Sequence, residues 1–256
     1  MIKKILSLIL PPILYKIFYK QTYQYKGRYN SYLFAKSASS QIKTYLDKFS
    51  DSKFNSPNQV VVTDRFAIAA TLCGMLRKST INVLDYGGGY NSVFSYIKQS
   101  TNKVANCFIL ESDVFLKNFV NRIPKKFKKY IKYISSLNEI NKKLDLIVFN
   151  SSLQYIYNYP VILKKIFLLR SPYIVVTRTN FHNKKKDYFS IETGIKGSQH
   201  PYIFFSFENL KNFFLKNNYK LIFENKYNIG RYKHSSIKDD SYFHKDLIFF
   251  NKNNTN

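Results

Sequence analysis

The most constraining stretch of the sequence is a short apolar run that ends at an acidic residue and is followed at once by three glycines. It spans Ile81 to Ser92 and reads Ile-Asn-Val-Leu-Asp-Tyr-Gly-Gly-Gly-Tyr-Asn-Ser. The apolar run predicts a buried strand, and the glycines predict a tight turn that lets main-chain N–H groups approach a polar ligand. Apolar residues at helical spacing from Tyr90 to Lys98 then predict a helix. A nucleotide-type cofactor fits this unit, and a purely structural turn is the alternative.

Asp85, which lies just before the glycines, separates two classes of cofactor. A dinucleotide places its phosphates at such a turn, where a carboxylate would repel them. S-adenosylmethionine carries an ammonium and a sulfonium but no phosphate, so an acid at the end of the strand attracts it. We therefore expect S-adenosylmethionine as cofactor, with Asp85, Gly87, Gly88 and Gly89 at its methionine end.

Composition limits the class of protein. A chain of 256 residues with 45% hydrophobic and 18% aromatic residues suits one large α/β domain. The net charge of +26 is typical of proteins that bind nucleic acid or anionic membranes. However, Lys, Asn, Ile, Tyr and Phe are plentiful and Trp is absent. An AT-rich genome gives this composition to a protein of any function, so the positive charge is weaker evidence for such a partner. The two cysteines and four histidines lack metal-binding spacing, so we expect no metal site. We expect both cysteines to be buried free thiols of a protein in a reducing cytoplasm.

Residues 1–60 are expected to form a helical segment ahead of the main domain, which spans residues 61–256. The apolar and basic stretch of residues 1–20 is interrupted by Pro11, Pro12 and Lys16, so neither a spanning helix nor a signal peptide fits. This stretch can lie on an anionic membrane surface or pack on its own domain. The expected location is the cytoplasm, with peripheral contact at the inner face of the cell membrane.

Further apolar runs predict a doubly wound sheet, because they alternate with helical segments. Glu111 ends the run after the glycine turn, where a carboxylate can accept hydrogen bonds from both ribose hydroxyls of a nucleotide; a helix cap is the alternative. Ser135 is expected near the adenine. The predicted strands are Ala105 to Glu111, Tyr130 to Ser136, Asp145 to Ser152 and Tyr173 to Thr179, and an antiparallel pair at Tyr219 to Tyr227 and Leu247 to Asn251.

Polar residues that follow the last two parallel strands are candidates for the reaction site. Ser152, Gln154 and Tyr155 are expected beside the glycine turn, at the sheet edge where open α/β folds bind ligands. Arg178 and Thr179 are expected at the tip of the next strand.

Residues 180–206 are predicted to form a long substrate loop inserted in the domain. Its polar or aromatic candidates include Glu192, Gln199 and Tyr202. His182 and His200 are the candidates for a catalytic base, because a neutral imidazole is available near pH 7; the alternative is that both are ordinary loop residues.

Taken in order, these motifs resemble a little-characterised family of class I S-adenosylmethionine-dependent methyltransferases associated with bacterial surface-polysaccharide gene clusters. The resemblance covers most of the chain and implies a Rossmann-like, seven-stranded, mostly parallel sheet with an antiparallel last strand. The matching segments are Pro11-Pro12, Gly27-Arg28-Tyr29, Asp64-Arg65-Phe66, Asp85-Tyr86-Gly87-Gly88-Gly89, Leu110-Glu111, Ser152-Leu153-Gln154-Tyr155, Arg178-Thr179 and His200-Pro201.

The resemblance implies methyl transfer to a hydroxyl or amine of a cell-envelope glycan or its lipid-linked precursor. Under this resemblance Ser152 contacts the cofactor. The acceptor, a glycan or another small molecule, is bound by Gln154, Tyr155, Arg178 and Thr179. One alternative is an RNA methyltransferase, although Asn-Ser-Ser-Leu differs from the Asn-Pro-Pro-Tyr motif that grips a flipped base, so nucleic acid is not an expected partner. The other alternative is a non-catalytic, membrane-associated scaffold with a degenerate fold. The oligomeric state is left open.

Overall fold

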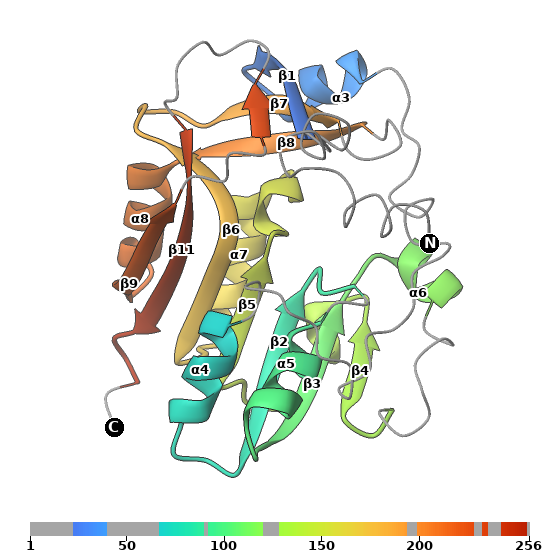
Figure 1. Cartoon of the computed structure of the whole chain (residues 1–256), viewed down its shortest axis with the longest axis vertical. Helices are drawn as coiled ribbons and strands as arrows, with labels where there is room; N and C mark the ends of the chain where they lie inside the picture. The colour runs from blue at the N-terminus through green and yellow to red at the C-terminus, as the bar shows by residue number, and fades with distance from the viewer. Residues whose placement is uncertain are drawn as a thin grey trace, which may run out of the picture.

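The computed structural model describes residues 23–39, 67–89, 92–119, 128–193, 199–227, 232–234 and 242–254. Its centre is a mostly parallel sheet with the strand order β4-β3-β2-β5-β6-β11-β9 (Figure 1). The last strand, β11, is antiparallel to both β6 and β9. This confirms the predicted seven-stranded sheet with an antiparallel last strand. The strands are β2 Thr80–Tyr86, β3 Val104–Leu110, β4 Ile131–Ile134, β5 Leu146–Asn150, β6 Tyr173–His182, β9 Tyr219–Tyr227 and β11 Tyr242–Asn251.

Helices cover both faces of this sheet, as the doubly wound prediction requires. Successive side chains of a strand point to opposite faces, so on β2 Val83 packs in one core cluster and Leu84 in the other. Helices α4 and α5 pack in the cluster of Val83, and α7 and α8 pack in the cluster of Leu84. The helices are α4 Ala67–Met75, α5 Val93–Ser100, α6 Asp113–Phe119, α7 Tyr159–Leu168 and α8 Phe207–Lys216, with short 3-10 turns η5 Leu137–Glu139 and η6 Leu153–Tyr155. None of the helices described here is long and apolar enough to cross a membrane.

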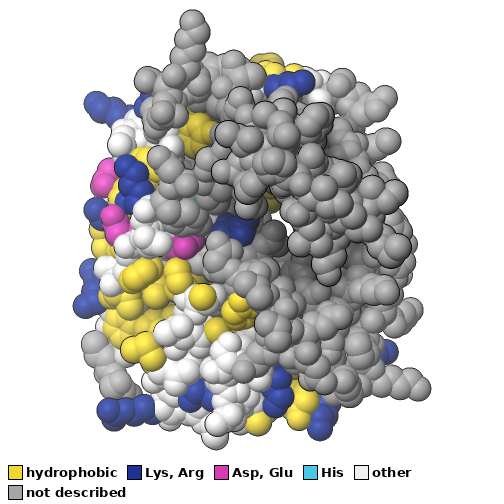
Figure 2. Space-filling model, viewed as in Figure 1, with side chains coloured by type: hydrophobic (Ala, Val, Ile, Leu, Met, Phe, Trp, Pro, Cys, Tyr) yellow, Lys and Arg dark blue, Asp and Glu magenta, His cyan; other side chains and the backbone are white. Residues whose placement is uncertain are grey.

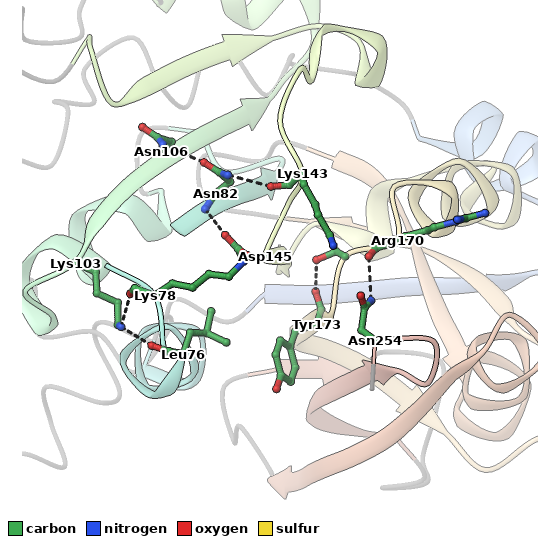
Figure 3. Close-up of polar contacts among 11 residues, drawn as sticks. Leu76, Lys78, Asn82, Lys103, Asn106, Lys143, Asp145, Arg170, Tyr173 and Asn254 are labelled. Carbon is green, nitrogen blue, oxygen red and sulfur yellow. Dashed lines mark hydrogen bonds and ion pairs between the residues drawn. The ribbon is translucent and has the colours of Figure 1, made fainter. Parts of the chain in front are cut away.

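A polar network ties three parallel strands together at their amino ends (Figure 3). Asp145, just before β5, accepts a hydrogen bond from the Asn82 N–H at 2.8 Å and pairs with Lys78. The Asn82 side chain accepts from Asn106 of β3 at 3.0 Å and donates to the Lys143 carbonyl at 3.0 Å. These bonds set the register of β2, β3 and β5 at the edge of the sheet opposite the glycine turn.

A second group of strands extends the sheet beyond the carboxyl end of β6, and we call it the β-platform. It contains β1 Tyr23–Tyr29, β7 Tyr188–Thr193, β8 Gln199–Ser206 and β10 Tyr232–His234. It joins the main sheet where Phe181 and His182 pair with Phe205 and Ser206. In Figure 1 the platform crosses above the carboxyl ends of β2 and β5. It has its own aromatic core, made of Tyr25, Tyr188, Tyr202 and Phe204.

The platform corrects the prediction of a long substrate loop over residues 180–206. Most of that range is strand, because its alternating aromatic residues bury themselves against Tyr25 of β1, whose ring lies 4.8 Å from that of Tyr202 and 4.9 Å from that of Phe204. The expected helical segment over residues 1–60 is also wrong in part, because Tyr23–Tyr29 forms the strand β1; within the described part of that segment, residues 23–39, the helix is α3 Tyr32–Ala38. Residues 1–22 and 40–66, with the expected membrane contact, lie outside the described residues.

Strand β6 is longer than predicted, which moves Arg178 and Thr179 away from a strand tip. The strand was predicted to end at Thr179, but β6 continues to His182. The polar side chain of Asn180 is accommodated inside the fold, because its amide donates a hydrogen bond to the Tyr25 hydroxyl at 3.0 Å. Arg178 sits at an irregularity in the pairing with β11 and has a φ of 55°. Its N–H donates to Asp246 at 2.8 Å.

Replacing Phe249 by Ala should lower the free energy of unfolding by about 3 to 5 kcal/mol, because its fully buried ring stacks on Phe214 of α8 at 3.8 Å. Phe223 on the neighbouring strand β9 is 41% exposed and serves as the matched control. Phe223→Ala should cost less than about 1 kcal/mol. Urea denaturation measures both, and equal losses would contradict the packing described here.

Candidate functional site

The glycine turn between β2 and α5 has a backbone that only glycine adopts without strain at two of its positions. Gly87 has a φ of 70° and Gly89 a φ of 55°. The Gly87 N–H donates to the Leu110 carbonyl at 2.9 Å, and a Cβ on Gly87 would lie 2.9 Å from the Cβ of Ser152. The Tyr133 hydroxyl donates to the Gly89 carbonyl at 2.8 Å. The turn is therefore held between β3, β4 and the segment after β5.

Asp85 lies beneath this turn rather than in front of it. Its carboxylate is fully buried, and its Oδ2 accepts a hydrogen bond from the Val93 N–H, in the first turn of α5, at 2.8 Å. A Cβ on Gly88 would lie 2.5 Å from the carboxyl carbon of Asp85. Burial raises the pKa of Asp85 to about 6, against the lowering effect of the Val93 hydrogen bond. Asp85 thus positions the turn and the helix, and its Oδ1 has no hydrogen-bond partner among the described residues.

Glu111 lies at the end of β3 and faces the turn, where the sequence predicted a ribose-binding carboxylate. It is 9% exposed, and its Oε1 accepts a hydrogen bond from the Gly89 N–H at 2.9 Å. Burial raises the pKa of Glu111 to about 7, although the N–H groups of Gly89 and Ser112 lower it. A carboxylate of this kind accepts hydrogen bonds from a ligand more strongly when it is ionised.

A cavity of about 340 Å³ opens at the carboxyl ends of β2, β3 and β5, below the β-platform. It brings together five residues that the sequence singled out: Gly87, Glu111, Ser152, Tyr155 and His200. Its described lining carries two carboxylates and no Lys or Arg, and it consists of Tyr86, Gly87, Glu111, Ser112, Ser151, Ser152, Tyr155, Ile156, Glu192 and His200.

The wall opposite the glycine turn belongs to the platform and to η6. The Tyr155 hydroxyl donates to Glu192 Oε2 at 2.7 Å, and Glu192 is only 4% exposed. His200 of β8 pairs directly with Glu192 of β7, so both side chains lie on the same face of the hairpin. The Tyr155 ring stands edge-on to Tyr202 at 5.4 Å. The sequence singled out His200 and Tyr155 here, whereas Glu192 was one polar residue among several in an expected loop.

Several predicted site residues are not among the described residues that line the cavity, namely Asp85, Gly88, Gly89, Ser135, Gln154, Arg178, Thr179 and His182. Gln154 is buried, where its amide donates to the Ser151 hydroxyl at 3.0 Å and accepts from Thr179 at 3.3 Å. It therefore supports the cavity wall from behind, together with Thr179. Arg178 lies at the β6–β11 irregularity. Ser135 is exposed, and both its N–H and its hydroxyl donate to Glu139 Oε1, at 2.9 and 3.3 Å.

His182 is buried on the β-platform side of the fold and is not among the described residues that line the cavity. Its Nδ1 accepts a hydrogen bond from the Lys184 N–H at 3.0 Å, so its Nε2 carries the proton and donates to the Phe204 carbonyl at 3.1 Å. Its ring also stacks on Tyr188 at 4.9 Å, and burial lowers its pKa. Within the described ranges, no group of three His, Cys, Asp or Glu side chains could hold a metal ion.

Comparison with known proteins found likenesses only among solved structures. No family model and no curated protein matches the chain. A 1,6-didemethyltoxoflavin-N1-methyltransferase from Burkholderia thailandensis, solved with S-adenosylhomocysteine, is 11% identical over 73% of this chain and 78% of its own, with a TM-score of 0.49.

Two further structures are similar at a comparable level. An amino pentose methyltransferase from Micromonospora echinaspora, solved with bound S-adenosylmethionine, is 9% identical over 73% of this chain and 90% of its own, with a TM-score of 0.48. A proposed RNA methyltransferase from Pyrococcus horikoshii is 17% identical over 74% of this chain and 80% of its own, with a TM-score of 0.42. With every one of these TM-scores below 0.5, the likenesses do not identify an acceptor.

Replacing Gly87 by Ala should lower the free energy of unfolding by more than about 1 kcal/mol, since the new methyl group meets Ser152 and the left-handed backbone disfavours it. Gly74 in α4 is the matched control, because a Cβ there would lie 3.7 Å from Thr101, at ordinary contact distance. Gly74→Ala should leave stability unchanged or raise it by about 0.5 to 1 kcal/mol. Chemical denaturation of both variants tests this, and a stable Gly87→Ala protein would refute the geometry of the turn.

Glu111 should make the protein less stable as pH rises from about 4.5 to 7. The folded protein keeps a proton on Glu111 up to a pKa of about 7, whereas the unfolded chain releases it near 4.5. The free energy of unfolding therefore falls by up to about 1.4 kcal/mol per pH unit in this window. Glu111→Gln does not titrate, so the stability of the wild type minus that of the variant should fall across the window and level off above pH 7. A difference that stays constant would contradict the raised pKa.

Proposed function

We propose that this protein is an S-adenosylmethionine-dependent methyltransferase that acts on a hydroxyl or amine of a cell-envelope glycan or its lipid-linked precursor. The observation that carries the cofactor is the glycine turn, whose Gly89 N–H donates to the acidic side chain of Glu111 at the cavity wall. An acidic group at such a turn suits S-adenosylmethionine, which carries a sulfonium and no phosphate, better than the pyrophosphate of a dinucleotide.

The residues of the cofactor wall fit S-adenosylmethionine. Glu111 accepts the Gly89 N–H through one oxygen and, as a carboxylate, can accept further hydrogen bonds from ribose hydroxyls. The hydroxyl of Ser152 is buried at the cavity wall without a hydrogen-bond partner among the described residues, which is costly unless a ligand supplies one. Gly87 leaves no room for a side chain between the turn and Ser152. When bound, the cofactor supplies an electrophilic methyl group on a positively charged sulfur.

The rest of the cavity wall orients the acceptor and excludes water, which supplies most of the catalysis in a displacement of this kind. Tyr155, Glu192 and His200 are close enough to one another to contact one acceptor group. His200 is one of the two histidines that the sequence offered as a base for a hydroxyl acceptor, and it lines this wall. The assignment of a glycan rests on the family resemblance of the sequence motifs.

The two alternative functions gain no support from the described structure. A nucleic-acid enzyme would bring backbone phosphates to its cavity, whereas the lining is acidic. On the face seen in Figure 2, the Lys and Arg side chains of the described surface are scattered rather than gathered at one place. A degenerate scaffold would not need a glycine turn packed to contact distance against Ser152 and Glu111. Cytoplasmic location, with membrane contact through residues 1–20, is proposed from the sequence alone.

Calorimetric titration with S-adenosylhomocysteine should show binding, and titration with NAD should show none. Ser152→Ala should weaken S-adenosylhomocysteine binding about 5- to 30-fold, equivalent to the loss of one hydrogen bond of about 1 to 2 kcal/mol. The unliganded variant should be at least as stable as the wild type, because its partnerless hydroxyl is gone.

Ser171→Ala is the matched control for this experiment. The Ser171 hydroxyl is also buried, but it donates to the Tyr173 carbonyl at 3.1 Å, away from the cavity. This variant should lose about 1 kcal/mol of stability and keep its affinity. Absence of S-adenosylhomocysteine binding to the wild type, or equal binding of NAD, would refute the proposed cofactor.

A further inference from the structure

Strand β4 is the outermost strand of the main sheet and lies beside β3 (Figure 1). A second cavity, of about 230 Å³, opens along the start of this strand, and we call it the lysine cavity. It shares no described lining residue with the cavity below the β-platform. Its lining residue Asn106 precedes Glu111 of that first cavity by five residues, about 16 Å of extended strand. The lysine cavity is therefore a separate site.

Lysine is the main charged residue around the lysine cavity. Its described lining contains four lysines and neither Asp nor Glu. The amides of Asn106 and Asn141 add uncharged hydrogen-bonding groups, and the Asn106 amide is held by a hydrogen bond to Asn82 at 3.0 Å (Figure 3). The lysines are Lys128, Lys129, Lys132 and Lys142. Four positive charges therefore surround one small cavity.

Most of this positive charge has no described counter-charge. None of the four lysines forms an ion pair with a described carboxylate. Hydrogen bonds from the N–H groups of Ser135 and Ser136 lower the pKa of Glu139, and the charge of Lys132 adds a smaller lowering effect. Setting Glu139 against the four lysines leaves about three positive charges at the lysine cavity, and these repel one another unless an anion binds.

Two of the lysines are positioned by contacts that do not cancel their charge. Lys132 Nζ donates to the Glu139 carbonyl oxygen, a neutral group, at 3.2 Å. Lys129 Nζ lies 4.8 Å from the centroid of the Tyr130 ring, which also lines the lysine cavity. An aromatic face attracts an ammonium group without neutralising it, and an ammonium has three N–H donors. Both lysines therefore keep donors for an anion.

We propose that the lysine cavity binds a diphosphate group, carried either by a soluble molecule or by a lipid headgroup. A diphosphate carries about two to three negative charges near pH 7, because each phosphate carries between about one and two. This charge matches the positive charge that Glu139 leaves uncompensated. A nucleic acid spaces its phosphates along a strand and needs basic groups spread along a groove, whereas these lysines surround one cavity. The inference goes beyond the proposed function and does not depend on it.

Calorimetric titration with inorganic diphosphate tests this binding at about 0.15 M ionic strength, where attraction between distant surface charges is largely screened. The expected result is one site that binds diphosphate at least about 10-fold more tightly than inorganic phosphate, because the second phosphate reaches further ammonium groups. The affinity should be the same with and without S-adenosylhomocysteine, because the two cavities are separate.

A pair of double variants separates the lysine cavity from the net charge of the chain. Lys129→Gln with Lys132→Gln should weaken diphosphate binding at least about 10-fold, the loss expected for two charge-assisted hydrogen bonds. Lys164→Gln with Lys165→Gln removes the same charge from exposed positions of α7 and should change the affinity by less than about 2-fold. Lys129→Arg with Lys132→Arg keeps the charge and should retain most of the binding. Thermal unfolding without ligand checks that each variant is folded.

Vesicles identify which kind of molecule carries the diphosphate. The probes are vesicles of equal parts phosphatidylcholine and diacylglycerol diphosphate, compared with vesicles of phosphatidylcholine alone. Co-sedimentation with the first kind that free diphosphate reverses, and that Lys129→Gln with Lys132→Gln removes, assigns a lipid headgroup. If free diphosphate binds at the lysine cavity but co-sedimentation is absent, or is unchanged in that variant, the ligand is a soluble diphosphate.

Several results would overturn the inference. One is the absence of diphosphate binding to the wild type, and another is an equal loss of binding in the Lys129 and Lys132 variant and in the Lys164 and Lys165 variant, because net charge then explains the attraction. Displacement of S-adenosylhomocysteine by diphosphate would place the ligand in the first cavity. A short oligouridine that binds more tightly than diphosphate and depends on Lys129 and Lys132 would show that the site takes nucleic acid instead.

Discussion

The packing around the glycine turn is the constraint on which the rest of this structure depends. Asp85 lies beneath Gly88, and Ser152 touches Gly87, at distances that exclude a side chain at either of these two glycines. The turn can hold this shape only if β2, β3 and β5 end side by side in register, and the network around Asp145 sets that register from the far edge. The geometry of the cavity is thus decided at both ends of the same strands.

The side chains at the cavity below the β-platform differ from the composition of the chain as a whole. The chain is strongly basic, whereas the described lining includes Glu111 and Glu192. Net charge acts on diffusion and on weak surface association, whereas the groups inside a cavity act at contact distance and with little screening.

The β-platform adds a second wall to the cavity at the carboxyl edge of the main sheet. The main sheet supplies only strand ends and turns at its carboxyl edge, which leaves the side facing solvent open. Here β6 continues past that edge and pairs with β8, and the hairpin of β7 and β8 carries Glu192 and His200 over the cavity. The aromatic core of Tyr25, Tyr188, Tyr202 and Phe204 packs the strands that carry those side chains against β1.

By itself, the sequence determined the doubly wound sheet, its antiparallel last strand and the glycine turn with Glu111 beside it, because apolar periodicity and consecutive glycines act locally along the chain. Only the tertiary structure decided the wall that the β-platform adds to the cavity. The strands β1 and β7 are separated by most of the chain, and their pairing depends on aromatic contacts that no local pattern encodes. The surroundings of a side chain are set by residues that are distant in sequence. For this reason the sequence did not predict that Asp85 lies behind the turn, or that His182 and Thr179 form hydrogen bonds inside the fold. The place of Glu192 at the cavity, beside Tyr155, was set in the same way.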